Sequence, residues 1–249
     1  MDFEIKITRD SNEILEAQRL RFEVFNLEMK KGLELSYRNG LDTDDYDPLC
    51  DHLIVRDLNS KQVVGTYRLL LGSKARKHFG FYSEREFNLE NIKNLRGELL
   101  ELGRTCTHKD YRDKGLIPMM WEAIADYVKA HKVRYIFGCA SLSRVHPREA
   151  SEFFSHLKEK YYAPEEFRVY PVPGKAFHGL EDHIKIRDEQ SVFLRLPSLI
   201  KGYLRVGALL CGPPALDLEF GTTDLFLILD MQKMSGEYLQ RFGFLGTKV

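Results

Sequence analysis

The sequence predicts an α/β protein in which a mixed sheet is covered by helices. Two segments, 133–141 and 225–231, are apolar almost throughout, as strands buried on both faces of a central sheet are. Segments with helical spacing of their apolar residues, 11–29 and 117–131 among them, alternate with the strands. Because repeats, low-complexity stretches and a clear linker are absent, we expect residues 1–249 to form a single domain.

The first half of the chain alternates strand-like and helix-like segments. Residues 3–9 alternate apolar and polar side chains with a period of two, which predicts a strand. The segment 11–29 reads as a helix, and Ser11 or Asn12 can cap it. Residues 52–58 and 62–72 are two apolar runs joined by a short turn, and they predict a β-hairpin.

The second half repeats this alternation. A strand is expected at 98–106, where charged residues stand among leucines, and a helix follows at 117–131. Prolines near the first positions of two further segments favour helix starts there, because proline is tolerated in the first turn. The remaining expectations are helices at 146–162, 197–210 and 232–242 and strands at 133–141 and 225–231. Residues 163–187, with their prolines and glycines, give no clear prediction.

Composition limits the class of function. The chain has 37 basic and 37 acidic residues, which argues against a general nucleic-acid binder. Its four cysteines form no C-x-x-C pair, a reduced pattern that is typical of cytoplasmic proteins. Residues 1–10 are too charged for a signal peptide, and no run of about 18 apolar residues predicts a membrane span. We therefore expect a cytoplasmic protein and leave open peripheral association with the inner face of the membrane.

The stretch from Glu98 to Trp121 combines a strand, a basic loop and a helix start. The loop carries Lys109, Arg112 and Lys114, and the helix opens after a glycine. A helix start presents free N–H donors and the positive end of a dipole, so this arrangement suits an anionic group. Ionisable residues within the preceding strand indicate that the chemistry lies in the same stretch.

Residues 107–131 resemble the acyl-donor motif of the GNAT N-acyltransferase superfamily. In that superfamily an R-x-x-G-x-[GA] loop receives the donor's pyrophosphate, and Arg112 and Gly115 match it here. Ile117 stands where the pattern has a small residue, a departure that is compatible with acyl carrier protein as donor in place of coenzyme A. The resemblance implies a three-layer αβα domain with a mixed, mostly antiparallel sheet splayed at its fourth and fifth strands.

A narrower resemblance covers most of the chain. The chain is similar to the ornithine N-acyltransferases of ornithine-lipid synthesis, called hemolysin-like in some descriptions, and its layout looks like that of acyl-homoserine-lactone synthases. The segments that carry the likeness are RLRFEVF (19–25), DTDDYD (42–47), DHLIV (51–55), VVGTYRLL (63–70), ELGRTC (101–106), YIFGCAS (135–141), PSLIKGYLRVGA (197–208) and FGTTDLFLIL (220–229).

This resemblance implies a transfer of a 3-hydroxylated fatty acyl group from acyl carrier protein to the α-amino group of ornithine, giving lyso-ornithine lipid. The donor would be the phosphopantetheine of acyl carrier protein in preference to acyl-coenzyme A, and no cofactor would be bound permanently. One alternative changes the acceptor to glycine, lysine or the precursor of an acyl-homoserine lactone. Another alternative is a non-catalytic module that senses acyl carrier protein or lipid.

Glu101 and Arg104 are the candidate catalytic residues. A carboxylate half-buried among leucines has a raised pKa and suits a general base for the acceptor's ammonium. Arg104 and Arg68 are candidates for holding the acceptor's carboxylate, since a guanidinium matches it with two hydrogen bonds. Residues three positions apart in a regular strand point to opposite faces, so a shared site requires a bulge, for which Gly103 is the natural place.

Further candidates lie outside the strand. Asp44 and Asp47 belong either to a solvated loop with turn-forming aspartates or to an acceptor site that binds a second amine. The family likeness favours a place for Arg21 in the substrate cleft.

Three of the remaining expectations concern partners and metals. The basic run Lys74, Arg76 and Lys77 is either a solvated face or a dock for acidic acyl carrier protein. The segment 197–210 is either a membrane-surface helix or core packing with a charged rim. We expect no metal site, because HGLEDH (178–183) lacks the H-E-x-x-H spacing.

Overall fold

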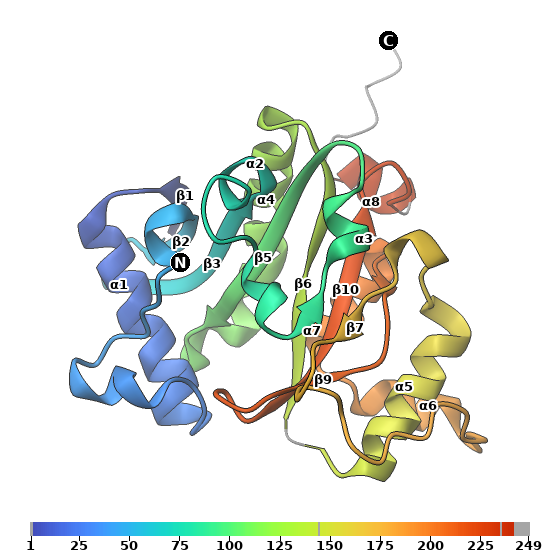
Figure 1. Cartoon of the computed structure of the whole chain (residues 1–249). Helices are drawn as coiled ribbons and strands as arrows, with labels where there is room; N and C mark the ends of the chain where they lie inside the picture. The colour runs from blue at the N-terminus through green and yellow to red at the C-terminus, as the bar shows by residue number, and fades with distance from the viewer. Residues whose placement is uncertain (1, 144, 235, 242–249) are drawn as a thin grey trace. The chain divides into compact units, whose positions relative to one another are not determined.

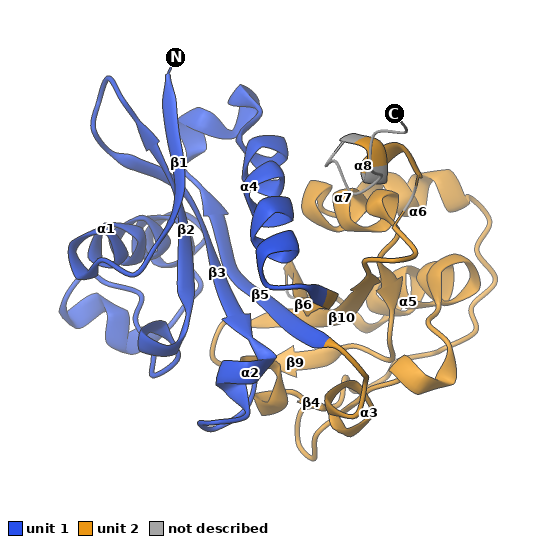
Figure 2. Ribbon diagram, turned by 90° about the horizontal axis from the view of Figure 1, so that it is seen from above, with its two compact units in different colours: residues 1–81, 98–133 blue, residues 82–97, 134–249 orange. Residues whose placement is uncertain are grey.

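The computed structural model describes residues 2–143, 145–234 and 236–241 (Figure 1). The chain divides into two compact units (Figure 2): unit 1 consists of Met1–Phe81 and Glu98–Val133, and unit 2 of Tyr82–Gly97 and Arg134–Val249. Strands and helices pack together in each unit, so the predicted α/β class is confirmed. The single domain and the splay between strands stay predictions.

Unit 1 is an antiparallel sheet with one long helix on each face. Its strands lie in the order β1-β2-β3-β5. The elements are β1 (Phe3–Thr8), α1 (Ser11–Arg21), η1 (Phe22–Glu28), η2 (Glu34–Arg38), η3 (Asp47–Leu49), β2 (Asp51–Asp57), β3 (Val63–Leu71), α2 (Gly72–Ala75), β5 (Glu98–Thr107), η5 (Lys109–Lys114) and α4 (Leu116–Ala130).

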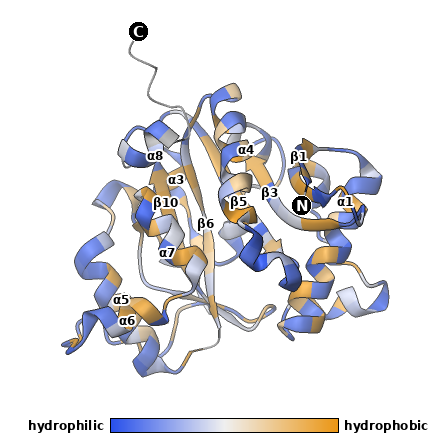
Figure 3. Ribbon diagram, turned by 180° about the vertical axis from the view of Figure 1, so that it is seen from behind, coloured by the Kyte–Doolittle hydropathy of each residue, from blue (hydrophilic) through white to orange (hydrophobic). Residues whose placement is uncertain are grey.

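Side chains that alternate along the strands separate the two faces of this sheet. Cys106 packs with Ala17 and Leu20 of α1, whereas a Cβ added at Gly65 would touch Met120 of α4. Figure 2 shows α1 and α4 on opposite sides of the strands of unit 1. All nine residues of β3 are buried, and Figure 3 shows its hydrophobic character. Arg68 is therefore a charged residue within a core strand.

Unit 2 is built around β10, which pairs antiparallel with β6, β8 and β9. In Figure 2, β4 and α3 lie on one side of β10, and α5, α6 and α7 lie on the other. The elements are η4 (Tyr82–Arg85), β4 (Phe87–Asn88), α3 (Glu90–Lys93), β6 (Val133–Ser143), α5 (Pro147–Tyr161), η6 (Glu165–Phe167), β7 (Tyr170–Pro171), α6 (Glu189–Arg195), α7 (Ser198–Val206), β8 (Leu209–Leu210), β9 (Ala215–Asp217), β10 (Thr222–Asp230) and α8 (Gly236–Arg241).

Two predicted boundaries in unit 2 are wrong. The helix expected at 197–210 ends with α7 at Val206, because Gly207 takes a left-handed φ of 105° and the chain then enters β8. Ile200 and Leu204 of α7 are buried, as the core-packing alternative for this helix predicts. The closing helix is α8, which begins four residues later than expected, and residues 235 and 242 lie outside the described part.

No helix in the described part of the chain combines the length and the apolar character that a membrane span requires.

Candidate active site

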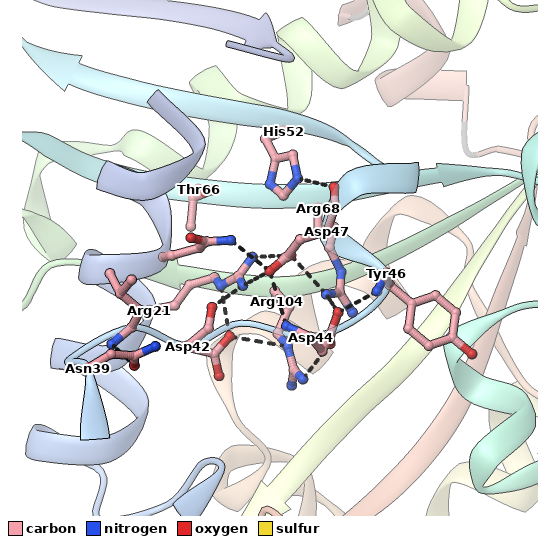
Figure 4. Close-up of polar contacts among 12 residues, drawn as sticks. Arg21, Asn39, Asp42, Asp44, Tyr46, Asp47, His52, Thr66, Arg68 and Arg104 are labelled. Carbon is pink, nitrogen blue, oxygen red and sulfur yellow. Dashed lines mark hydrogen bonds and ion pairs between the residues drawn. The ribbon is translucent and has the colours of Figure 1, made fainter. Parts of the chain in front are cut away.

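Three arginines and three aspartates form one buried network in unit 1. Each arginine comes from a different element, Arg21 from the end of α1, Arg68 from β3 and Arg104 from β5, whereas all the aspartates come from one loop. Figure 4 shows the six side chains turned toward one another. The aspartates are Asp42, Asp44 and Asp47.

Arg21 fixes the acidic loop against α1. Its Nη1 and Nη2 atoms donate to Oδ1 and Oδ2 of Asp47 over 2.9 and 2.8 Å, and its Nε lies 2.8 Å from Oδ1 of Asp42. Its Nη2 also donates to the carbonyl oxygen of Asp42. The Arg21 side chain is 0% exposed. A two-pronged contact of this kind sets position as well as energy, so Arg21 holds the loop in place.

Asp44 joins the two remaining arginines. Its Oδ1 accepts a hydrogen bond of 2.6 Å from Nη1 of Arg68, and its Oδ2 accepts one of 2.9 Å from Nη2 of Arg104. Nη1 of Arg68 also donates to Oδ1 of Asp47 over 3.1 Å. The guanidinium groups of β3 and β5 are thereby held at the same carboxylate.

A β-bulge places Arg104 beside this network. β3 and β5 pair Thr66 with Cys106 and Arg68 with Gly103, so one residue of β3 stands opposite two of β5. Arg104 takes a left-handed φ of 50°, which is uncommon for a residue other than glycine. The predicted bulge is therefore present, but it lies at Arg104 and Thr105 and not at Gly103.

The bulge brings the two candidate catalytic residues to one face of the sheet. Glu101 pairs with Leu70, and Gly103 pairs with Arg68, so Glu101 and Arg68 point to the same side. Arg104 reaches Asp44 on that side because the bulge shifts the alternation by one residue. In a regular strand Arg104 and Glu101 would point to opposite faces.

Charge compensation in the network outweighs the cost of burial. Burial opposes ionisation of Asp47, yet the nearby guanidinium groups of Arg21 and Arg68 hold its pKa well below the usual range. Asp44 behaves in the same way, because Arg68 and Arg104 lower its pKa against the effect of burial. Burial lowers the pKa of His52, whose Nε2 lies 3.0 Å from the carbonyl oxygen of Asp47. This contact gives His52 a structural role at the start of β2.

Glu101 is 5% exposed and has a buried thiol as a neighbour. Burial raises the pKa of Cys50 to about 12, with Arg68 acting in the opposite direction and Glu101 adding to the rise. Cys50 is therefore a neutral thiol beside Glu101 and Arg68, and not a nucleophile. The pattern of cysteines in the sequence gave no indication of this neighbour.

The predicted donor loop forms a helix start of the expected kind. η5 ends at Lys114, Gly115 follows with a left-handed φ of 72°, and α4 begins at Leu116. A Cβ added at Gly115 would meet no heavy atom within 4 Å. Nη1 and Nη2 of Arg112 donate to the two carboxylate oxygens of Glu28 over 2.7 Å each. Arg112 is thus tied to η1, at 44% exposure of its side chain.

The network unites most of the candidates that sequence reasoning selected. Sequence reasoning gave no role to Asp42 and Gln18, although Gln18 donates to Asp47 over 2.9 Å. The D-x-D-D-x-D spacing of residues 42–47 is the signal that points to Asp42. The solvated-loop reading of the aspartates is wrong, because the three side chains are at most 7% exposed. Lys74 of the basic run pairs with Asp51 over 2.8 Å.

Comparison with known proteins gives both a domain family and closer relatives. Residues 20–122 match the acetyltransferase (GNAT) domain. The chain is 35% identical to the L-ornithine N(alpha)-acyltransferase of Brucella abortus, with 96% of this chain and 88% of the relative covered. It is 34% identical to the protein of the same name from Rhodobacter capsulatus, with 96% and 93% covered.

Solved structures agree on the fold. The structure of FeeM, an N-acyl amino acid synthase from uncultured soil microbes, matches with a TM-score of 0.52 at 10% identity, covering 93% of this chain and 92% of the other. A CoA-dependent acyl-homoserine lactone synthase, BjaI, matches with a TM-score of 0.53 at 13% identity, covering 98% and 89%. At these identities the likeness concerns the fold alone.

Fold and relatives together define an acyltransferase with a GNAT domain. The chain belongs to the family of L-ornithine N(alpha)-acyltransferases.

Removing one charge from the network tests its structural importance. We expect Arg21→Gln to lower the free energy of unfolding by roughly 3–5 kcal/mol, because it leaves buried carboxylates without their partner. Arg19→Gln, an exposed arginine in the same helix, is the matched control and should change stability by less than about 0.5 kcal/mol. Urea denaturation followed by circular dichroism measures both, and equal losses would contradict a special role for Arg21.

Acid should unfold the protein through carboxylates of unit 1 whose pKa is lowered in the folded state. The pKa values of Asp44 and Asp47 are lowered, and that of Asp51 falls to about 2 because its hydrogen bonds outweigh burial. Groups with a depressed folded-state pKa stabilise fully above the unfolded value of about 4 and lose their contribution below it. We expect the free energy of unfolding to fall between about pH 4 and pH 2, measured by urea titration at each pH. An unchanged value over that range would contradict this assignment.

Proposed function

We propose that this acyltransferase moves a 3-hydroxylated fatty acyl group from acyl carrier protein to the α-amino group of ornithine, giving lyso-ornithine lipid. The observation that carries the proposal is the agreement of four relatives, each 32–35% identical over 96–97% of the chain, on the name L-ornithine N(alpha)-acyltransferase. The donor and the lipid product are inferred from the sequence likeness of the whole chain.

The reaction needs a neutral amine, a stabilised oxyanion and a thiolate leaving group. In our proposal Glu101 takes a proton from the acceptor's ammonium, directly or through one water, and the amine nitrogen then attacks the thioester carbon. The carbon–sulfur bond breaks as the amide forms, and the released phosphopantetheine thiolate takes a proton from solvent. The buried position of Glu101 on the same face of the sheet as Arg68 and Arg104 supports this role, because the base then lies beside the arginine that would hold the acceptor.

Two features of the bulge support a place for the thioester and the acceptor there. A bulge takes residues out of the regular hydrogen-bond ladder, so backbone N–H groups at Arg104 and Thr105 are suited to receive the oxyanion. Arg104 is also the least buried arginine of the network, with 7% of its side chain exposed against 5% for Arg68 and 0% for Arg21. We assign the acceptor's carboxylate to Arg104, with Arg68 and Arg21 holding the aspartates.

The aspartates give the proposed acceptor site its polarity. Ornithine carries a second ammonium group, and Asp44 contacts Arg104 over 2.9 Å, closer than Asp42 at 3.4 Å. A bound diamino acid would place a carboxylate near Arg104 and an ammonium near Asp44, so that both charges are compensated. Asp47 remains engaged by Arg21 in this arrangement.

The donor would be held at the start of α4. Arg112, Gly115 and the free N–H groups of the helix start suit the phosphate of phosphopantetheine. The contact of Arg112 with Glu28 is exposed, so a phosphate can replace the carboxylate at low cost. Basic residues near the loop and in the run that includes Lys77 would attract the acidic carrier protein.

The function is tested with purified protein, 3-hydroxyacyl carrier protein or acyl-coenzyme A, and a mixture of ornithine, lysine and glycine. We expect mass spectrometry to find N-acylated ornithine as the main product, formed faster from the carrier protein. Acylated glycine or lysine as the main product would overturn the acceptor, and a faster reaction with coenzyme A would overturn the donor. Absence of any acylated amine would overturn the function.

A conservative substitution tests the base. We expect Glu101→Gln to lower kcat by about 10²- to 10⁴-fold, because an amide cannot accept the ammonium proton. Glu98→Gln is the matched control on the same strand, since Glu98 points to the opposite face and its amide variant can still accept the N–H of Ser73. Steady-state rates of the two variants at several pH values decide the matter, and a Glu101→Gln rate close to the native one would remove Glu101 from the mechanism.

A further inference from the structure

Unit 2 contains a buried acidic cluster that the proposed reaction does not use. Asp224 and Thr222 lie on β10. In the pairing of β10 with β6, Asp224 stands opposite Ser141 and Phe226 stands opposite Cys139. The side chains of Thr222, Asp224 and Cys139 therefore share one face of the sheet. Glu86, which directly precedes β4, covers that face. We call Glu86, Cys139, Asp224 and Thr222 the β10 acid cluster.

The ligand atoms of this cluster converge on a small volume. One carboxylate oxygen of Glu86, one of Asp224 and the Sγ of Cys139 all lie within 4.8 Å of one another. A zinc ion holds oxygen and sulfur ligands at about 2.0–2.3 Å in a tetrahedral arrangement, so two ligands of one ion lie about 3.3–3.8 Å apart. The three groups would therefore have to approach one another by about 1 Å to share an ion.

The cluster leaves buried polar atoms without partners. Oε2 of Glu86 and Oδ1 of Asp224 accept no hydrogen bond from the described residues, although Glu86 and Asp224 are only 2% and 4% exposed. The charge of Lys175 acts on Glu86 to lower its pKa, but among the described residues no lysine or arginine forms an ion pair with either carboxylate. Buried acceptors of this kind are costly, so a donor or a cation is expected at this place.

Two carboxylates meet in this cluster, one from Glu86 and one from Asp224, and both residues are buried. Two like charges this close together in the interior repel each other unless a proton or a cation lies between them. A divalent ion would supply that positive charge.

One side of the cluster is open to solvent. Cys139 is half-buried and Ser141 is exposed, in contrast to the two acids. The Sγ of Cys139 also lies 3.4 Å from Oγ of Ser83, which would donate to the sulfur once the thiol is ionised. An ion can therefore reach the acids past Cys139, which is itself a ligand.

We propose that Glu86, Cys139 and Asp224 bind a divalent transition-metal ion of the zinc class, with the Thr222 hydroxyl or a water molecule in the fourth position. A thiolate among the ligands favours zinc over calcium or magnesium, which prefer oxygen ligands only. The ion would join the 82–97 segment to the β6–β10 ladder within unit 2, so its binding energy would stabilise that unit. This inference does not depend on the acceptor or donor proposed above.

Metal binding is tested directly on the full chain with Zn²⁺ as probe. We expect one zinc per chain by elemental mass spectrometry after chelator treatment, reloading and removal of loose ion. Glu86→Gln and Asp224→Asn should each weaken binding at least about tenfold in a chelator-competition titration. Asp230→Asn is the matched control, because Asp230 is a buried acid on the same strand that is paired with Arg134 over 2.8 Å.

A second measurement tests the site even if the Glu86→Gln and Asp224→Asn variants fail to fold. Cobalt bound to the native chain should show the near-ultraviolet absorption of a thiolate ligand, and Cys139→Ser should remove that band while keeping the folded circular dichroism spectrum. Cys211→Ser, a buried cysteine outside the cluster, should retain the band. Absence of stoichiometric zinc, or equal affinity in the Asp224→Asn and native chains, would overturn the proposal and leave a carboxyl pair that shares a proton.

Discussion

The burial of arginine and aspartate side chains in one network constrains unit 1 more than any other interaction. An isolated charge in a core strand such as β3 would be too costly to keep, so Arg68 requires carboxylates on its own face of the sheet. The acidic loop supplies them, and Arg21 in turn fixes that loop against α1. Helix, loop and strands are therefore positioned by mutual charge compensation.

The same network explains the unusual backbone at the centre of the site. A left-handed residue other than glycine costs roughly 1–2 kcal/mol and persists only when its surroundings determine it. The contact of Arg104 with Asp44 supplies such a determinant, and the bulge in turn brings Arg104 to the face of Glu101. Local strain and the shared face are thus two consequences of one set of ion pairs.

The two units differ in the partners of their buried carboxylates. In unit 1 each aspartate of the network contacts at least one guanidinium, and the charges balance. In unit 2, Glu86 and Asp224 face each other without such a partner among the described residues. The contrast makes the second cluster informative, because a stable fold rarely leaves two buried carboxylates without a compensating charge.

Periodicity and composition determined the class of the fold and most of its elements, because strand and helix patterns are local properties of the sequence. The odd spacing of Glu101 and Arg104 also predicted a bulge, since only a break in alternation unites their side chains. The tertiary structure decided what local patterns cannot contain: the position of the bulge, the engagement of Arg21 by Asp42 and Asp47, and the meeting of Glu86 with Asp224. Those contacts join segments far apart in the chain, and only packing of the whole sheet brings them together.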